Sequence, residues 1–198
     1  LVLGLLVASA KGSFDTQSTE LTEMSAKVVL LDRFLAHYGP ETKEARNLLR
    51  GNVVRMLDRT WSKDSASPSQ VEPPSTGADV LYDKMQGLSP KDDTQRSLKE
   101  QALSIAVGLG QTRWLMYEQS VTSVSMPLLV VLVFWLTVIF ISFGLFAPPN
   151  ATVVASLFVS ALSVSGAIFL ILEMYTPYSG LIQISSAPLR AALAHLGQ

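Results

Sequence analysis

The chain has 198 residues, of which 48% are hydrophobic and only 16% charged, and its formal net charge is −1. Soluble domains have about 25% charged residues, and here nearly all of the charges fall within residues 11–118. The near-zero net charge gives no sign of nucleic-acid binding. The absence of cysteine excludes disulfide scaffolds, thiolate zinc sites and cysteine nucleophiles.

The chain opens with a short apolar stretch, LVLGLLVASA, at residues 1–10. A helix that crosses a bilayer needs about 20 residues, so this stretch is too short to span one. It also lacks the initiating Met and the basic region of a signal peptide. We therefore expect residues 1–10 to be the C-terminal part of a transmembrane helix whose beginning is missing.

Residues 11–122 are predicted to form a helical bundle. A first helix ends at Gly39 and Pro40, and a second helix begins at once, which favours an antiparallel pair. Residues 62–77 are rich in Ser and Pro and predict a flexible loop, and a short helix and a long helix over 92–122 follow. Apolar residues spaced by three and four predict the core, at Leu21, Met24, Val28, Leu31, Leu35, Tyr38, Ala45, Leu49, Val53, Met56, Thr60, Leu98, Ala102, Ile105, Leu109, Thr112 and Met116.

The second helix also carries five basic residues at helical spacing: Lys43, Arg46, Arg50, Arg55 and Arg59. They could form a stripe that binds anions or lipid headgroups. The favoured interpretation is a solvated helix face, paired with neighbouring carboxylates, namely those of Glu41, Glu44 and Asp58.

Residues 123–174 are predicted to form a transmembrane hairpin. Two apolar stretches, 126–147 and 151–174, are each long enough to cross the hydrocarbon core, and the turn APPNA joins them. The turn has no Lys or Arg, whereas residues 11–122 have many. The positive-inside rule therefore places residues 11–122 in the cytoplasm. The predicted fold is an all-α membrane protein whose long helices extend from the membrane into a cytoplasmic bundle.

A stripe of small residues follows one side of the second span. In one interpretation it allows close helix packing, with hydroxyls that bond across the contact. In the other it faces water in a conduction path. Packing is favoured for the five residues Thr152, Ser156, Ser160, Ser163 and Ala167.

Residues 175–198 are predicted to form an interfacial turn and a short C-terminal helix. Pro177 ends the second span, Gly180 permits a turn, and Tyr175 and Tyr178 suit the membrane interface. Glu173 lies at the cytoplasmic end of the span, and a basic residue such as Arg113 is a hypothetical partner for it. The short helix has an apolar face that could lie on the membrane or against the bundle, formed by Leu189, Ala192, Leu193 and Leu196.

No motif predicts catalysis, a metal site or a cofactor. The sequence has no phosphate-binding loop, nucleophile elbow, zinc-protease motif or dinucleotide fingerprint. Asp92 and Asp93 begin a helix, where the helix dipole favours carboxylates without any metal. We therefore expect a protein that is not an enzyme.

Three stretches of the chain resemble the bestrophin-like family of bacterial membrane proteins. They are SFDTQSTEL, LDRFLAHYGPETKEARNLLR and ILEMYTPYSGLIQISSAPLR. The family pattern usually has Asp and Phe where this chain has Tyr175 and Tyr178. The residues of the signature corner in this chain are Glu173, Pro177, Tyr178, Ser179 and Gly180.

The resemblance implies four membrane spans with a helical insert between the second and third. The family name points to the bestrophins, which are pentameric anion channels whose second span lines the pore. By position, the resemblance implies that the pore-lining residues of this chain are Leu3, Leu6, Ala10 and Ser13. We expect the protein to be a homo-oligomer in the bacterial inner membrane and to act as a channel for a small anion. Its expected partner is the lipid bilayer, and no contact with nucleic acid is expected. The alternative is a non-conducting scaffold or accessory subunit that binds a partner through its cytoplasmic helices.

Overall fold

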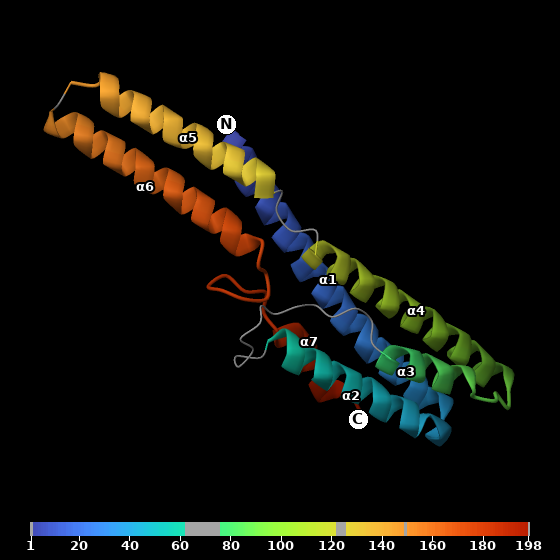
Figure 1. Ribbon diagram of the computed structural model, residues 1–198. Coiled ribbons are helices and arrows are strands. Elements are labelled where there is room, and N and C mark those ends of the chain that lie inside the picture. The colour runs from blue at the N-terminus through green and yellow to red at the C-terminus, as the bar shows by residue number, and fades with distance from the viewer. Residues whose placement is uncertain (1, 62–75, 122–125, 149, 198) are drawn as a thin grey trace.

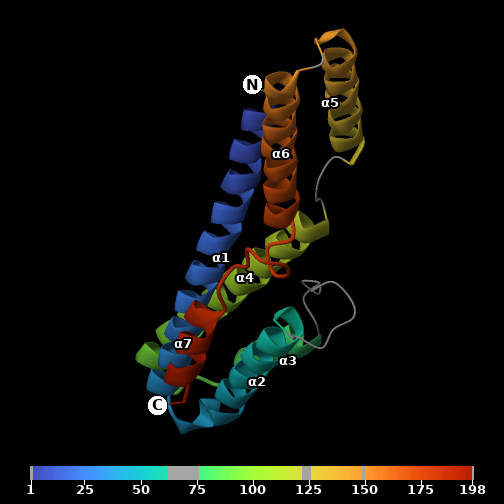
Figure 2. The same cartoon turned by 90° about the vertical axis from the view of Figure 1, so that its left-hand side faces the viewer.

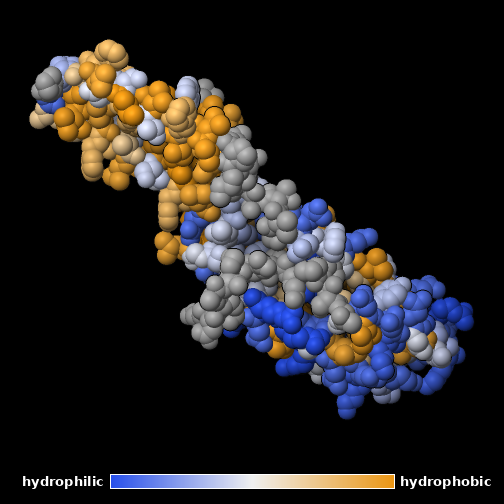
Figure 3. Space-filling view, in the orientation of Figure 1, coloured by the Kyte–Doolittle hydropathy of each residue, from blue (hydrophilic) through white to orange (hydrophobic). Residues whose placement is uncertain are grey.

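The computed structural model describes residues 2–61, 76–121, 126–148 and 150–197, and these form seven α-helices and one short 3-10 helix. The molecule is elongated, with an apolar end and a polar end (Figures 1 and 3). The apolar end consists of the first part of α1 (Val2–Tyr38), α5 (Met126–Phe146) and α6 (Ala151–Met174). The polar bundle consists of the rest of α1 with α2 (Lys43–Thr60), α3 (Thr76–Gln86), α4 (Asp93–Val121) and α7 (Ala187–His195).

Helix α1 runs through both ends of the molecule without interruption (Figure 1). Its 37 residues extend for about 55 Å, at about 1.5 Å per residue. The helix ends where Gly39 adopts a φ of 136° and Pro40 follows, as predicted. The 3-10 helix Pro40–Thr42 then reverses the chain, and α2 runs back antiparallel to α1.

The predicted apolar seam of α1 is confirmed, because all six of its residues are buried. In α2, Met56 is only half-buried and Leu57 is buried beside it. In α4 only Ala102 and Met116 of the six predicted residues are buried, and the others are half-buried. The seam of α4 is therefore covered less completely than the seam of α1.

The apolar face of α7 packs against the bundle and not on the membrane surface. Leu189, Ala192 and Leu196 are buried, and Leu189 and Leu196 belong to the core of the bundle with residues of α1 and α2. The interpretation of α7 as a helix on the membrane surface is therefore wrong. Of the predicted loop 62–77, Thr76 and Gly77 already belong to α3, and residues 62–75 lie outside the described residues.

A buried ion pair joins α1, α2 and the C-terminal segment. Arg46 donates two hydrogen bonds of 2.8 Å to Asp32, from Nε to Oδ1 and from Nη2 to Oδ2. The backbone N–H of Gly197 donates to Oδ2 of Asp32 at 3.1 Å. The prediction that Arg46 belongs to a solvated face is therefore wrong, because its carboxylate partner is only 3% exposed.

The Asp32 pair predicts how acid affects the protein. Burial alone would raise the pKa of Asp32, but the hydrogen bonds from Arg46 and Gly197 outweigh it and hold the pKa below its ordinary value. A lowered pKa contributes stability above the unfolded-state value of about 4, and this contribution is lost as the pH falls through the folded-state pKa. The melting temperature of the parent is therefore expected to exceed that of Asp32→Asn by less at pH 3 than at pH 7. An excess that stays constant between these pH values would contradict this.

The predicted membrane spans form the helices α5 and α6, both long and apolar enough to cross a bilayer. The side chain of Asn150 accepts a hydrogen bond from the N–H of Val153 at 3.1 Å and caps α6. Helix α6 lies chiefly along α1, whereas α5 stands further out (Figure 2). Most of their large apolar residues are exposed in the single chain, which suits a surface covered by lipid or by other helices.

Candidate functional site

The chain after α6 folds into a compact corner around the carboxylate of Glu173. Its Oε1 accepts hydrogen bonds from the backbone N–H groups of Leu181 and Ile182, the second at 3.1 Å. Gly180 has a φ of +93°, and a Cβ at this position would lie 2.8 Å from Cδ of Glu173. Only glycine therefore fits at the point where the loop closes on the carboxylate.

The corner is docked on the polar bundle through two aromatic residues. Tyr178 is 4% exposed and packs edge-to-face on Trp61, with ring centroids 5.6 Å apart. The indole Nε1 of Trp61 donates to the carbonyl of Ile184 at 2.9 Å, and the N–H of Ile184 donates to the carbonyl of Pro177 at 2.7 Å. The corner thereby joins the end of α6 to the end of α2, a contact that the sequence did not predict.

Tyr178 does not lie at a lipid interface as expected. It belongs to a buried cluster with Leu21 and Met24 of α1 and Met116 of α4. Burial, with a smaller contribution from the nearby charge of Glu20, raises the pKa of Tyr178. The prediction failed because the aromatic ring of Tyr178 packs on the ring of Trp61, and the loop sequence alone does not reveal that partner.

The structure does not bring Glu173 and Arg113 together. Arg113 lies in a separate cavity between the bundle helices, and Glu173 bonds to the backbone of its own corner. The hypothetical Glu173–Arg113 pair is therefore wrong. Ser179 continues the turn, since its N–H donates to the carbonyl of Thr176 at 3.1 Å.

The four residues implied to line a pore do not share one environment in the single chain. Leu3 and Leu6 are half-buried, Ser13 is exposed, and Ala10 is fully buried. Ala10 is thus covered by its own chain and is not open to a lumen. Leu6 lines an apolar hollow with Leu132 and other residues of α5.

The small-residue stripe of α6 faces outward. Thr152, Ser156, Ser160 and Ser163 are exposed, and the hydroxyl of Ser163 donates to the carbonyl of Val159 in its own helix at 2.9 Å. Ala167 is half-buried. The stripe residues therefore do not form the main contacts of α6 with other helices of this chain. Larger residues form the more covered face of α6, at Val153, Leu157, Val164, Ile168 and Ile171.

Among the described residues, no group of three His, Asp or Glu side chains is placed to hold a metal ion. The carboxylate of Glu173 is directed to the backbone of its own corner. This geometry gives the corner a structural role, which is to close the chain after α6 and fix it to the bundle.

The family model described as Bestrophin-like domain matches residues 1–189. The chain belongs to the bestrophin-like family. No curated protein and no solved structure matches the chain significantly. The match covers the whole signature corner and all three helices of the apolar end. Family membership and the two long apolar helices indicate that this bestrophin-like protein is a membrane protein.

Proposed function

We propose that this bestrophin-like protein is one subunit of an oligomeric channel for small anions in the inner membrane of a bacterium. The observation that carries the proposal is the continuous helix α1, which runs from the apolar end into the polar bundle. Copies of α1 arranged around one axis would line a path that begins in the membrane and ends in the bundle. Such a ring has the closed symmetry that is usual in homo-oligomers.

The proposed topology is multi-pass, with residues 11–122 on the cytoplasmic side. The turn between α5 and α6 has no Lys or Arg, while the bundle holds nearly all of the basic residues. Leu3 and Leu6 would form apolar rings, and such rings gate by dewetting. Basic residues of the wider cytoplasmic part would raise the local concentration of anions. We assign no catalytic activity to the protein.

The exposed stripe of α6 supports assembly within the membrane. In the single chain the small side chains of Ser156 and Ser160 are exposed. Small residues allow helices of neighbouring subunits to approach closely, and close approach is a main source of helix association in lipid. We propose that this stripe contacts a second copy of the chain.

A second candidate function is a membrane scaffold that presents the bundle to another protein. The observation in its favour is an exposed apolar group on α4, where Val107, Trp114 and Leu115 are each about half exposed. Exposed apolar groups of this kind mark surfaces for protein association. A scaffold does not need a closed ring, so symmetry separates the two functions.

The oligomeric mass of the full-length protein in nanodiscs tests the channel. We expect a closed ring, pentameric as in bestrophins, and a chloride flux in liposomes that depends on the protein.

The double substitution of Ser156 and Ser160 by Leu is expected to weaken the ring, because larger side chains separate the helices. The matched control is Phe158→Leu on another side of α6. A monomer or dimer, or a ring without flux, would exclude the channel.

A further inference from the structure

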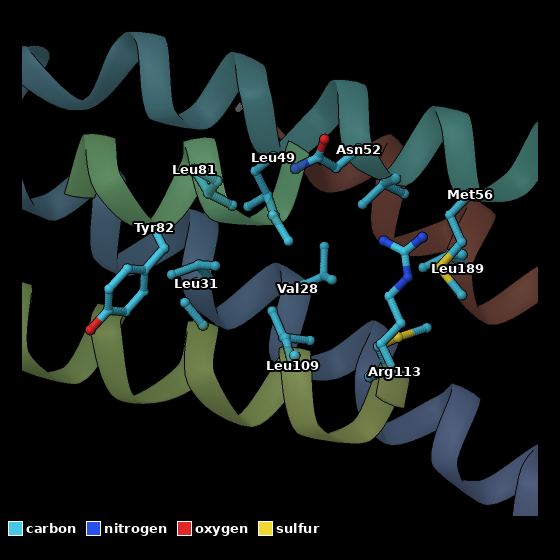
Figure 4. Close-up of a pocket in the computed structure, with 15 residues that line it drawn as sticks. Val28, Leu31, Leu49, Asn52, Met56, Leu81, Tyr82, Leu109, Arg113 and Leu189 are labelled. Atoms are coloured by element: carbon cyan, nitrogen blue, oxygen red, sulfur yellow. The ribbon is translucent and has the colours of Figure 1, made fainter. Parts of the chain in front are cut away.

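A cavity of about 100 Å³ lies inside the polar bundle, between α1, α2, α3 and α4 (Figure 4). Its walls are almost entirely apolar and include Val28, Leu31, Leu81 and Leu109. An enclosed apolar cavity of roughly 150 Å³ holds a benzene molecule, so this half-enclosed one has room for a few methylene groups.

The cavity exists because α4 presents small residues to it. Ala106 and Gly110 both line the cavity, and a Cβ added at Gly110 would meet no atom within 4 Å. Glycine inside a helix costs roughly 0.5–1 kcal/mol relative to alanine. A larger side chain at position 110 would therefore have room to enter the cavity.

The charged residue of this cavity is Arg113. Its side chain rises from α4 toward α2, with the guanidinium turned into the cavity (Figure 4). Within the described part of the chain, no hydrogen bond or ion pair involves this guanidinium, and no carboxylate lines the cavity. Burial, together with the like charges of Arg59 and Arg55, lowers the pKa of Arg113. A cation among apolar walls is costly without an anionic partner.

Besides Arg113, the wall has two polar residues, Asn52 and Tyr82, and Asn52 is already engaged. The Nδ2 of Asn52 donates to the carbonyl of Gly77 at 2.8 Å, and its Oδ1 accepts from Nη2 of Arg55. The amide of Asn52 therefore fixes the start of α3 and does not neutralise Arg113. A guanidinium presents a planar fork of donors that matches a carboxylate or phosphate.

We propose that this cavity binds an amphiphilic anion, with a carboxylate or phosphate head on Arg113 and an apolar tail among Val28, Leu31, Leu81 and Leu109. The ligand comes from water, because the cavity lies within the polar bundle and not at the apolar end. The site would allow a small water-borne amphiphile to act on the bundle, and it does not depend on whether the protein conducts ions.

Hexanoate, acetate and hexanol are the probes for this site, titrated by calorimetry into the full-length protein in phosphatidylcholine nanodiscs. Empty nanodiscs give the heat of partition into lipid. Hexanoate is expected to bind with saturation at least about tenfold more tightly than acetate, which lacks the tail, or hexanol, which lacks the charge. Equal affinity for hexanoate and hexanol, or no saturable binding, would overturn the proposal.

Two substitutions separate the head and tail contacts. Arg113→Gln is expected to weaken hexanoate binding about tenfold or more, whereas Arg33→Gln, on the exposed side of α1, leaves it unchanged. Gly110→Leu fills the cavity and is expected to abolish binding while the protein melts no earlier than the parent. Since this second variant keeps the charge of Arg113, it tests the site even if Arg113→Gln fails to fold. Parent-like binding by either variant would refute the site.

A membrane lipid could supply the same anionic chemistry, and lipid composition distinguishes it from a water-borne ligand. Hexanoate affinity is expected to be equal in nanodiscs of phosphatidylcholine and phosphatidylglycerol at high salt, which screens the surface charge. Loss of binding only in the phosphatidylglycerol discs would show that the lipid headgroup occupies the site, and it would overturn the assignment to a water-borne ligand.

Discussion

Asp32→Asn is expected to lower the free energy of unfolding by about 3 kcal/mol, because it removes the charge that pairs with Arg46 inside the bundle. Removing one partner of a buried pair typically costs about 3–5 kcal/mol, and the smaller figure applies since the Arg46 side chain is 22% exposed. The same carboxylate also accepts from the N–H of Gly197. The substitution therefore weakens the attachment of α1 to both α2 and the C-terminal segment.

Chemical unfolding followed by the fluorescence of Trp61 and the other tryptophans measures this effect in detergent or nanodiscs. The matched control is Asp93→Asn, which breaks an exposed pair with Arg96 on one turn of α4. Exposed pairs contribute little, so the control is expected to unfold like the parent. If both variants unfolded alike, the Asp32–Arg46 pair would have no special role in stability.

The sequence predicted the helices of the bundle well because each has a clear apolar period and clear end signals. The six seam residues of α1 are all buried, and Gly39 and Pro40 end the helix as expected. Asp32 was missed although it lies between Leu31 and Leu35 on the buried face. A carboxylate on the apolar side of a helix is a signal for a buried partner, but its partner Arg46 belongs to another helix.

The candidate site was predicted less well, because its contacts join residues far apart in the sequence. Pro177 and Gly180 correctly marked a turn, yet the role of Glu173 depends on the backbone of Leu181 and Ile182 folding back onto it. The burial of Tyr178 depends on Trp61 at the end of α2. Local patterns identify a turn, but they do not identify the surface on which that turn docks.

The stripe of α6 illustrates the same limit in the apolar end. Small residues at helical spacing favour close packing, and the pattern was correctly found. In the chain itself the larger residues Leu157, Val164 and Ile168 are the more covered ones, and the stripe points outward. An entirely apolar helix has no polar face to mark its orientation, so periodicity could not decide which side meets α1.

Gly180→Ala is expected to lower the free energy of unfolding by about 2 kcal/mol, the second large effect predicted for this protein. A non-glycine residue at a φ of +93° is strained by roughly 1–3 kcal/mol. The added Cβ would also displace the carboxylate of Glu173, which then loses the N–H groups of Leu181 and Ile182. Glu173→Gln keeps an oxygen that can accept these bonds and is expected to cost less, about 1 kcal/mol.

Thermal unfolding in nanodiscs, with limited proteolysis of the corner, measures both variants against Gly108→Ala. Gly108 lies within α4, and a Cβ there would meet no atom within 4 Å, so helix propensity alone predicts a small gain in stability. From highest to lowest melting temperature, the expected order is Gly108→Ala, parent, Glu173→Gln and then Gly180→Ala. If Gly180→Ala instead melted with the parent and resisted proteolysis equally, the loop would not need to close on Glu173. The corner would then be an ordinary surface turn, held on the bundle by the packing of Tyr178 and not by the carboxylate of Glu173.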